Sequence, residues 1–251
     1  MTPEPILVAW SGGKDSALAL RAVLADPLLA VEALLTTVTR EYDRISVHGV
    51  RRSLLRAQVA ALGLPLLEME IPASCDNTTY ESCLALALTG ARERNDRLRR
   101  CVFGDLFLED VRHYREGRLA ALGMQPIFPL WGKHTGELAR TFLDDGFRAV
   151  VVCVDSTRLA PSFSGRQYDA SFLDDLPRDV DPCGENGEFH TFVYDGPLFR
   201  ERVELTIGET VTRDERFVYT DLVPSVATPD RSPDHDRYHT IDPMAPDHLL
   251  D

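Results

Sequence analysis

Strand-like and helix-like segments alternate along the first 154 residues of this chain. Apolar, β-branched runs predict strands at 6–10, 30–38, 64–71, 100–104 and 149–154, with a short extended piece at 125–130. Apolar residues recur at helical spacing up to about 25 and over 50–62, 78–94, 108–122 and 135–145. Strands joined by helices pair in parallel, and the helices cover both faces of the sheet. We therefore expect an α/β fold with a doubly wound parallel sheet.

The pattern changes beyond Val154, where the elements become shorter. Strand-like alternation at 189–194, 203–208 and 217–220 predicts a smaller, mixed α+β lobe. We divide the chain into a first domain over 1–131, the smaller lobe over 132–221 and an acidic, proline-rich tail over 222–251 that we expect to be disordered. The three histidines of this tail lack the spacing of metal ligands, which favours a solvated terminus over a metal site: His235, His239 and His248.

The strongest local signal is a strand that turns into a helix through Ser11-Gly12-Gly13-Lys14-Asp15-Ser16. The two glycines allow the backbone to curl so that amide groups point inward, and the new helix adds its positive dipole end. The hydroxyls of Ser11 and Ser16 and the ammonium of Lys14 supply further donors. Asp15 stands where a Walker loop has Ser or Thr. The segment predicts a phosphate site of another kind.

Ligands of open α/β sheets bind beyond the carboxyl ends of the strands, near the point where the strand order reverses. Here those ends are followed by the loop at 11–16, by Thr36 and Thr37, and by Gly104 and Asp105. A polar segment over 40–46 is placed to close over a bound molecule. These positions are our candidates for a nucleotide site.

Composition narrows the classes of partner. The chain has 251 residues, with 27 Lys and Arg against 40 Asp and Glu, and a net charge of −13. An acidic surface disfavours nucleic acid as a partner. No apolar run is long enough for a membrane span, and we expect a cytoplasmic protein. Five cysteines without a Cys-x-x-Cys pair argue against disulfides and zinc; we expect Cys101 and Cys153 in the core and leave open whether Cys75 or Cys83 is reactive.

A second dense motif runs from Gly184 to Thr191. It holds Glu185, Asn186, Glu188 and His190 within six positions, more chemistry than a turn into a strand requires. If Phe189 points inward, strand periodicity puts Glu188 and His190 together on the opposite face. We expect this motif to bind a ligand.

The loop resembles the PP-loop of the ATP pyrophosphatases, which cleave ATP between its α and β phosphates. Together with further ordered segments, the chain is similar to the diphthine-ammonia ligase family. Those segments are 48–51, 104–105, 128–131, 165–166 and 184–191. Members that amidate diphthine on elongation factor 2 usually carry a second glycine and an acid-rich ending in the last motif; Asn186 and His190 resemble the bacterial branch instead.

The resemblance implies ATP and Mg²⁺ as cofactors and an AMP-forming ligase reaction. A carboxylate attacks the α-phosphorus to give an acyl adenylate and pyrophosphate, and ammonia or another amine then displaces AMP. The loop, Thr36, Thr37, Gly104 and Asp105 would hold the nucleotide, with Lys14 and Asp15 also catalytic and Asp15 and Asp105 as Mg²⁺ ligands.

For the amine half, Glu185 and Glu188 would bind ammonium or take its proton, with His190 as an alternative base. His48 and Arg51 would hold the carboxylate, and Asn186 completes the expected substrate site. The partners are then a small-molecule or protein-borne carboxylate and ammonia, and a homodimer stays open.

Two other functions are weighed. A tRNA-modifying enzyme of the thiolase or lysidine type needs a basic face or paired catalytic cysteines, and neither is evident. A non-catalytic ATP-binding sensor has no use for the acids around Gly184.

Overall fold

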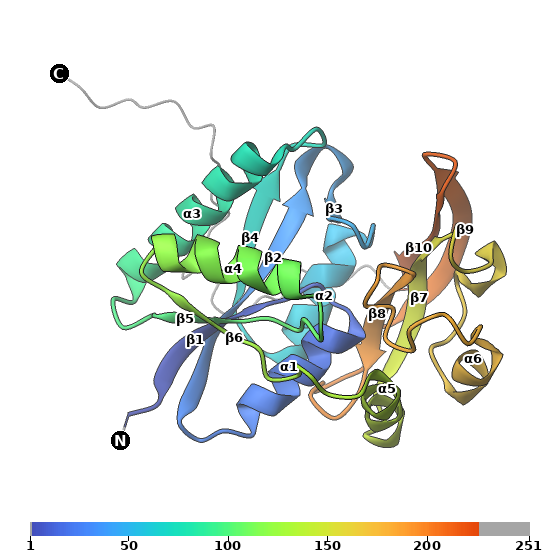
Figure 1. The fold of residues 1–251 in the computed structure, drawn as a ribbon, viewed down its shortest axis with the longest axis horizontal. Coiled ribbons are helices and arrows are strands. Elements are labelled where there is room, and N and C mark those ends of the chain that lie inside the picture. The colour runs from blue at the N-terminus through green and yellow to red at the C-terminus, as the bar shows by residue number, and fades with distance from the viewer. Residues whose placement is uncertain (1, 226–251) are drawn as a thin grey trace.

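The computed structural model describes residues 2–225, arranged around two sheets (Figure 1). The final strand, β10 (Phe217–Pro224), continues three residues into the segment expected to be a tail. Residues 222–224 are strand because they pair with β9 (Leu205–Arg213). The rest of the expected tail, with His235, His239 and His248, lies outside the described residues.

The first sheet is mostly parallel, as expected. β1 (Glu4–Ala9) lies at its centre, between β2 (Leu29–Thr39) and β5 (Arg100–Val102), and β6 (Gln125–Ile127) follows β5. β4 (Leu66–Ile71) pairs in parallel with β2. The two-residue strand β3 (Arg44–Ile45) pairs with β2 in antiparallel fashion, within the segment expected as a polar loop. The carboxyl ends of β1, β2, β4 and β5 therefore meet at one edge.

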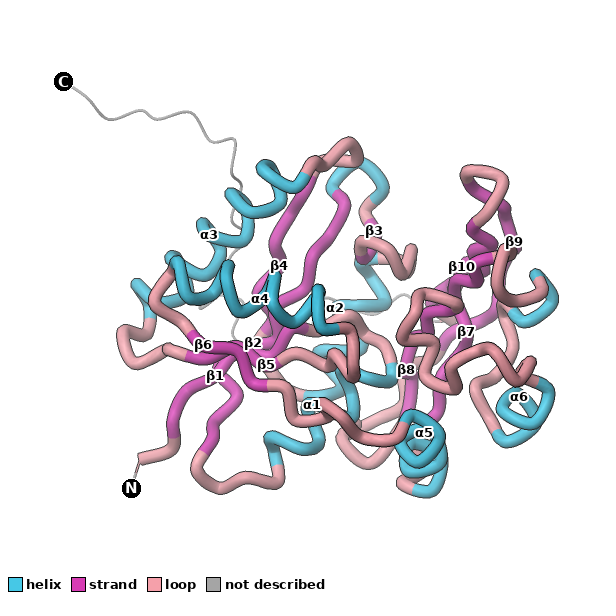
Figure 2. Tube along the Cα trace, viewed as in Figure 1, coloured by secondary structure: helices cyan, strands magenta, loops and turns pink. Residues whose placement is uncertain are grey.

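Helices cover both faces of this sheet (Figure 2). Strand periodicity divides β1 between two apolar cores, with Ile6 and Val8 in one and Leu7 in the other. The first core includes α1 (Lys14–Leu24) and α2 (Arg52–Leu62). The second includes α3 (Asn77–Arg94) and α4 (Glu109–Ala121), which hydrogen bonds from Tyr114 and Arg118 to Glu81 join side by side.

The second sheet has the order β8-β7-β10-β9, and all its pairs are antiparallel. β7 (Arg148–Asp155) lies inside it, next to β8 (Phe189–Asp195). The parallel pairing expected for 149–154 is wrong: this run is continuously apolar because β7 is buried along nearly its whole length, not because it belongs to the parallel sheet. α5 (Thr135–Asp144) and α6 (Ala170–Asp175) flank this sheet, and two 3₁₀ turns span Arg40–Tyr42 and Pro161–Phe163.

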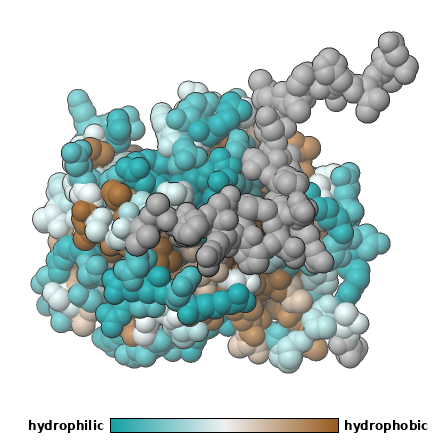
Figure 3. Space-filling model, turned by 180° about the vertical axis from the view of Figure 1, so that it is seen from behind, coloured by the Kyte–Doolittle hydropathy of each residue, from teal (hydrophilic) through white to brown (hydrophobic). Residues whose placement is uncertain are grey.

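The two sheets share one of the apolar cores, because residues of α1 and α2 belong to the same buried cluster as residues of β7 and β8. Within residues 2–225, no helix is long and apolar enough to cross a membrane. The face seen from behind is mostly hydrophilic, with apolar atoms in scattered groups (Figure 3), as the charge of −13 leads one to expect.

Candidate functional site

The glycine loop forms the expected turn between β1 and α1. Gly12 has a φ of +78°, in the left-handed region that favours glycine, and a Cβ there would lie 2.9 Å from Oε1 of Gln58. The Ser16 hydroxyl donates to the carbonyl of Gly13 at 2.8 Å. The Gly13 amide donates to Ser11 Oγ at 3.3 Å, and Ser11 Oγ lies 3.3 Å from Ser16 Oγ. The loop is thus tied together by its own hydroxyls.

The amides of the loop differ in what they bind. The Lys14 amide donates to Thr191 Oγ1 at 3.1 Å, so this amide and that of Gly13 already have acceptors within the protein. The next two amides, of Asp15 and Ser16, donate to no other residue in the part of the chain that the structure describes. Together with the dipole of α1 they leave a positive pole at the loop that suits an anion.

Strand β8 of the second sheet is joined directly to the loop. The amide of Val193 donates to the carbonyl of Gly12 at 2.9 Å. Gln58, fully buried on α2, donates from Nε2 to the carbonyls of Gly12 at 3.0 Å and Val193 at 2.5 Å, and accepts from Trp10 Nε1 at 2.8 Å. No motif marks Gln58 as part of the site, and only the packing of the two sheets reveals it. Thr191 ends the second motif, but its bond to the Lys14 amide could not be read from the sequence.

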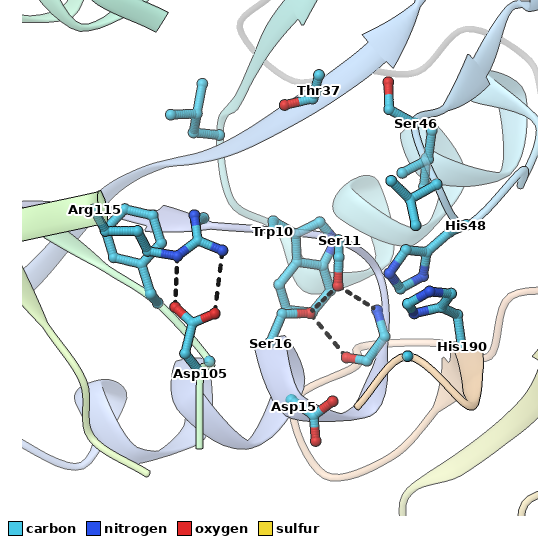
Figure 4. Close-up of a pocket in the computed structure, with 18 of the residues that line it drawn as sticks. Trp10, Ser11, Asp15, Ser16, Thr37, Ser46, His48, Asp105, Arg115 and His190 are labelled. Atoms are coloured by element: carbon cyan, nitrogen blue, oxygen red, sulfur yellow. Dashed lines mark hydrogen bonds and ion pairs between the residues drawn. The ribbon is translucent and has the colours of Figure 1, made fainter. Parts of the chain in front are cut away.

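A cavity of about 490 Å³ opens above the loop, at the carboxyl edge of the parallel sheet. It brings together residues of the loop, of β2 and β5, and of the second motif. The predicted site residues that line it are Ser11, Gly13, Lys14, Asp15, Ser16, Thr37, His48, Gly104, Asp105, Glu185 and His190. The loop and the second motif therefore face one cavity (Figure 4).

Lys14 and Asp15 form an ion pair at the base of the cavity, in which Lys14 is buried and Asp15 is partly exposed. Lys14 Nζ lies 2.9 Å from Asp15 Oδ2 and also donates to the carbonyl of Cys183. Burial acts to lower the pKa of Lys14, but Asp15 and neighbouring acids outweigh it and the pKa is raised. Burial raises the pKa of Asp15. Asp15 Oδ1 is buried and has no hydrogen-bond partner among the described residues.

Glu185 enters the cavity from the second motif. Its Oε1 accepts the amide of Leu106 at 2.7 Å, which attaches the motif to the segment that follows β5. Burial raises the pKa of Glu185 to about 7, against the opposing effect of that hydrogen bond. This carboxyl group therefore exchanges its proton near neutral pH.

Glu188 and Asn186 do not line the cavity. Glu188 is 1% exposed, and its Oε1 accepts the amide of Asp181 at 3.2 Å and Nδ2 of Asn186 at 3.0 Å. Phe189 is buried as expected, but Glu188 precedes β8 and does not share the face of His190. The structure thus brings Glu185 and His190 to the cavity and leaves Glu188 behind it.

His48 and His190 lie against each other, with ring centroids 4.6 Å apart. Burial lowers the pKa of His48 to about 4, and burial together with His48 and Lys14 lowers the pKa of His190 well below its usual value. Nδ1 of His48 lies 3.2 Å from the carbonyl of Thr191, so the neutral ring donates there and presents Nε2 as an acceptor. Both imidazoles are uncharged at neutral pH.

Three other predicted residues have partners of their own. Arg51 forms a bidentate pair with Asp221 of β10, with an Nη2 to Oδ2 distance of 2.6 Å, and does not line the cavity. Thr36 is buried and donates to the carbonyl of Trp10 at 2.7 Å. Asp105 is paired with Arg115 of α4, whose Nε lies 2.6 Å from Oδ2. Arg115 is a cavity residue that sequence reasoning missed.

The cysteines are free thiols. Cys101 and Cys153 are core residues, as expected. Cys183 borders the cavity, but burial raises its pKa far above the usual value. Burial also raises the pKa values of Cys75 and Cys83, so neither is an activated thiolate.

Comparison with known proteins agrees with this two-part site. Residues 5–126 match the model of the diphthamide synthase N-terminal domain, and residues 134–220 match that of the diphthamide synthase C-terminal domain. Curated relatives include the diphthine--ammonia ligases of Bos taurus, 30% identical over 111 residues, and of Homo sapiens, 30% identical over 110 residues. The aligned part covers about two fifths of this chain and of each of these relatives: 42% of both for the first and 41% of both for the second. The relative from Schizosaccharomyces pombe is 33% identical over 95 residues, which are 36% of this chain and 16% of that protein.

The loop, the cavity and the second motif all fall within the two matched ranges. Both family models therefore apply to the same site, and the chain belongs to the diphthine-ammonia ligase family.

Proposed function

We propose that this protein is an ATP-dependent amide ligase that activates a carboxylate as an acyl adenylate and transfers ammonia to it. The observation that supports this most is that the phosphate loop and Glu185 face one cavity. The names of the relatives point to diphthine and ammonia as substrates. We propose the chemical pair, a carboxylate and an amine, with diphthine as the first carboxylate to test.

In the first half-reaction, the carboxylate oxygen attacks the α-phosphorus and the bond to the β-phosphate oxygen breaks. The Asp15 and Ser16 amides, which donate to no other residue among those described, and the end of α1 stabilise the charge that grows on the leaving pyrophosphate. Lys14 holds this end of the site together through Asp15 and Cys183. Thr37 and Gly104 border the path of the nucleoside along the strand ends.

In the second half-reaction, the ammonia nitrogen attacks the acyl carbon, AMP leaves, and one proton departs from nitrogen. Glu185, whose pKa is raised to about 7 by burial, accepts that proton. His48 and His190 are uncharged at neutral pH, so neither adds a positive charge to the cavity. Glu188 has a supporting role, because it holds Asp181 and Asn186 behind the cavity.

Asp15 fits Mg²⁺, because its buried Oδ1 has no hydrogen-bond partner within the described chain. Among those residues no cluster of three or more His, Cys, Asp or Glu suits a metal, which is compatible with an ion that takes most of its ligands from phosphate and water. When bound, Mg²⁺ would offset negative charge on the triphosphate. Asp105 fits less well, because Arg115 occupies its carboxylate.

The test is to incubate the protein with MgATP, ammonium and either diphthine-bearing elongation factor 2 or a metabolite extract, and to measure AMP, pyrophosphate and an amidated mass. Lys14→Ala and Asp15→Asn abolish AMP formation, whereas Glu188→Gln leaves nucleotide binding intact. Equal loss of nucleotide binding in all three variants contradicts the two half-sites. A sensor releases no pyrophosphate with any substrate, and a tRNA-modifying enzyme releases it only with tRNA.

A further inference from the structure

Arg115 has a fixed place on one flank of the cavity. It extends from α4 to the end of β5, where Nη2 lies 3.1 Å from Oδ1 of Asp105 and Nε lies 2.6 Å from Oδ2. Its guanidinium also covers the ring of Phe103, 4.4 Å from the centroid. A carboxylate on one edge and an aromatic ring on one face hold the guanidinium plane in a single orientation.

This orientation places the guanidinium beside the phosphate loop. A Cβ on Gly104 would lie 2.9 Å from the carbonyl carbon of Asp15 and 3.1 Å from the amide nitrogen of Ser16, so the β5 end and the start of α1 are in close contact. Figure 4 shows the pair of Arg115 and Asp105 on one side of Ser16, with His48 and His190 on the other. Trp10, Ser11 and Ser16 lie between the two pairs in this view (Figure 4).

Arg115 also keeps a donor for a new anion. Lys14 donates to Asp15 and Cys183, and Arg118 pairs with Glu81 through Nη1 at 2.5 Å. Nη1 of Arg115 makes no hydrogen bond within the described residues. The cavity is lined by equal numbers of basic and acidic side chains: Lys14, Arg115 and Arg118 against Asp15, Asp105 and Glu185. A polyanion therefore needs a cation with donors to spare.

We propose that Arg115 binds the α-phosphate of the nucleotide, and that Asp105 is a positioning residue for Arg115. The inference rests on the proposed function, in which the pyrophosphate end lies on the loop and the nucleoside runs along the strand ends. The α-phosphate joins these two parts, so it lies next to Ser16 and Gly104, on the flank that Arg115 occupies. There the guanidinium neutralises charge at the phosphorus that the carboxylate attacks.

The test is calorimetric binding of AMP, adenosine and pyrophosphate in buffer with EDTA. AMP carries the α-phosphate, whereas adenosine and pyrophosphate each lack it. In Arg115→Gln, the AMP affinity falls about tenfold to a hundredfold, the range of a charge-assisted hydrogen bond, while adenosine and pyrophosphate stay within about twofold. Arg112→Gln is the matched control, because Arg112 lies on the same helix, covers Trp131 and does not line the cavity.

The outcomes separate this inference from the function on which it rests. Wild-type protein that binds neither AMP nor pyrophosphate refutes both. Wild-type protein that binds AMP no better than Arg115→Gln does refutes the role of Arg115 alone. If Arg115→Gln also loses pyrophosphate binding, Arg115→Lys must recover that binding while its affinity for AMP stays low, because lysine keeps the charge but lacks the planar fork. If Arg115→Lys does not behave in this way, the assignment is overturned.

Discussion

Replacing Glu185 by Gln should make the protein more stable, and the gain should grow as the pH rises. The variant keeps an oxygen that accepts the amide of Leu106 and removes the ionisable group. Because the pKa of Glu185 is raised from 4.5 to about 7 by burial, the folded protein holds this proton more tightly than the unfolded chain does. Wild-type stability therefore falls as the pH rises through this window.

The magnitude follows from the same shift. At about 1.4 kcal/mol per pKa unit, the shift from 4.5 to about 7 sets an upper bound of about 3.5 kcal/mol on the loss of unfolding free energy. The carboxylate is partly exposed, so water screens it and we expect about 1–2 kcal/mol. Urea unfolding of both proteins at pH 5 and pH 8 measures the difference. Glu209→Gln, on exposed β9, is the matched control.

A stability difference between Glu185→Gln and wild type that stays constant from pH 5 to pH 8 would refute the reasoning. It would mean that the Glu185 carboxylate is as well solvated in the folded protein as in the unfolded chain. The same result would remove the support for Glu185 as a proton acceptor near neutral pH.

Three further outcomes are expected. Gly104→Ala weakens pyrophosphate binding in calorimetry and lowers the free energy of unfolding by about 1–3 kcal/mol, because the added Cβ would press on the backbone of Asp15. Gly117→Ala is the control: Gly117 lies on α4 with open space around it, and the substitution raises the free energy of unfolding by about 1 kcal/mol. Asp221→Ala lowers the unfolding free energy in urea by about 1–2 kcal/mol, since it removes the partner of two partly exposed arginines, Arg44 of β3 and Arg51 at the start of α2. An unchanged midpoint would contradict this. In the folded protein a thiol reagent labels Cys75 alone, and all five cysteines react in guanidinium; rapid labelling of Cys183 would argue against its burial.

The fold of the first domain could be predicted from the sequence because the patterns that indicate it are local. Apolar strands, helical spacing and the glycine turn each depend on neighbouring residues, and the parallel sheet follows from their alternation. The pairing of β7 was not readable, because a continuously apolar strand suits either a parallel sheet or the middle of an antiparallel one.

Only part of the site could be predicted from the sequence, because only part of it is encoded in local patterns. The loop residues and Glu185 can be identified from their residue types and spacing. Gln58 and Arg115 have the pattern of ordinary helix residues, and only the three-dimensional packing places them at the site. Arg51 illustrates the opposite case. It has the chemistry to bind a carboxylate and receives one from the protein itself, in Asp221, 170 positions along the chain.

The bonds from β8 to the glycine loop have a consequence for how the molecule can be divided. Val193 and Thr191 complete the partners of Gly12 and Lys14, so a fragment that ends before the second sheet begins would leave these backbone groups facing water. Residues of both sheets are therefore needed to form the phosphate loop and its cavity. A molecule that binds in the cavity also stabilises the contact between the two sheets, and a rise in melting temperature with added pyrophosphate measures that effect.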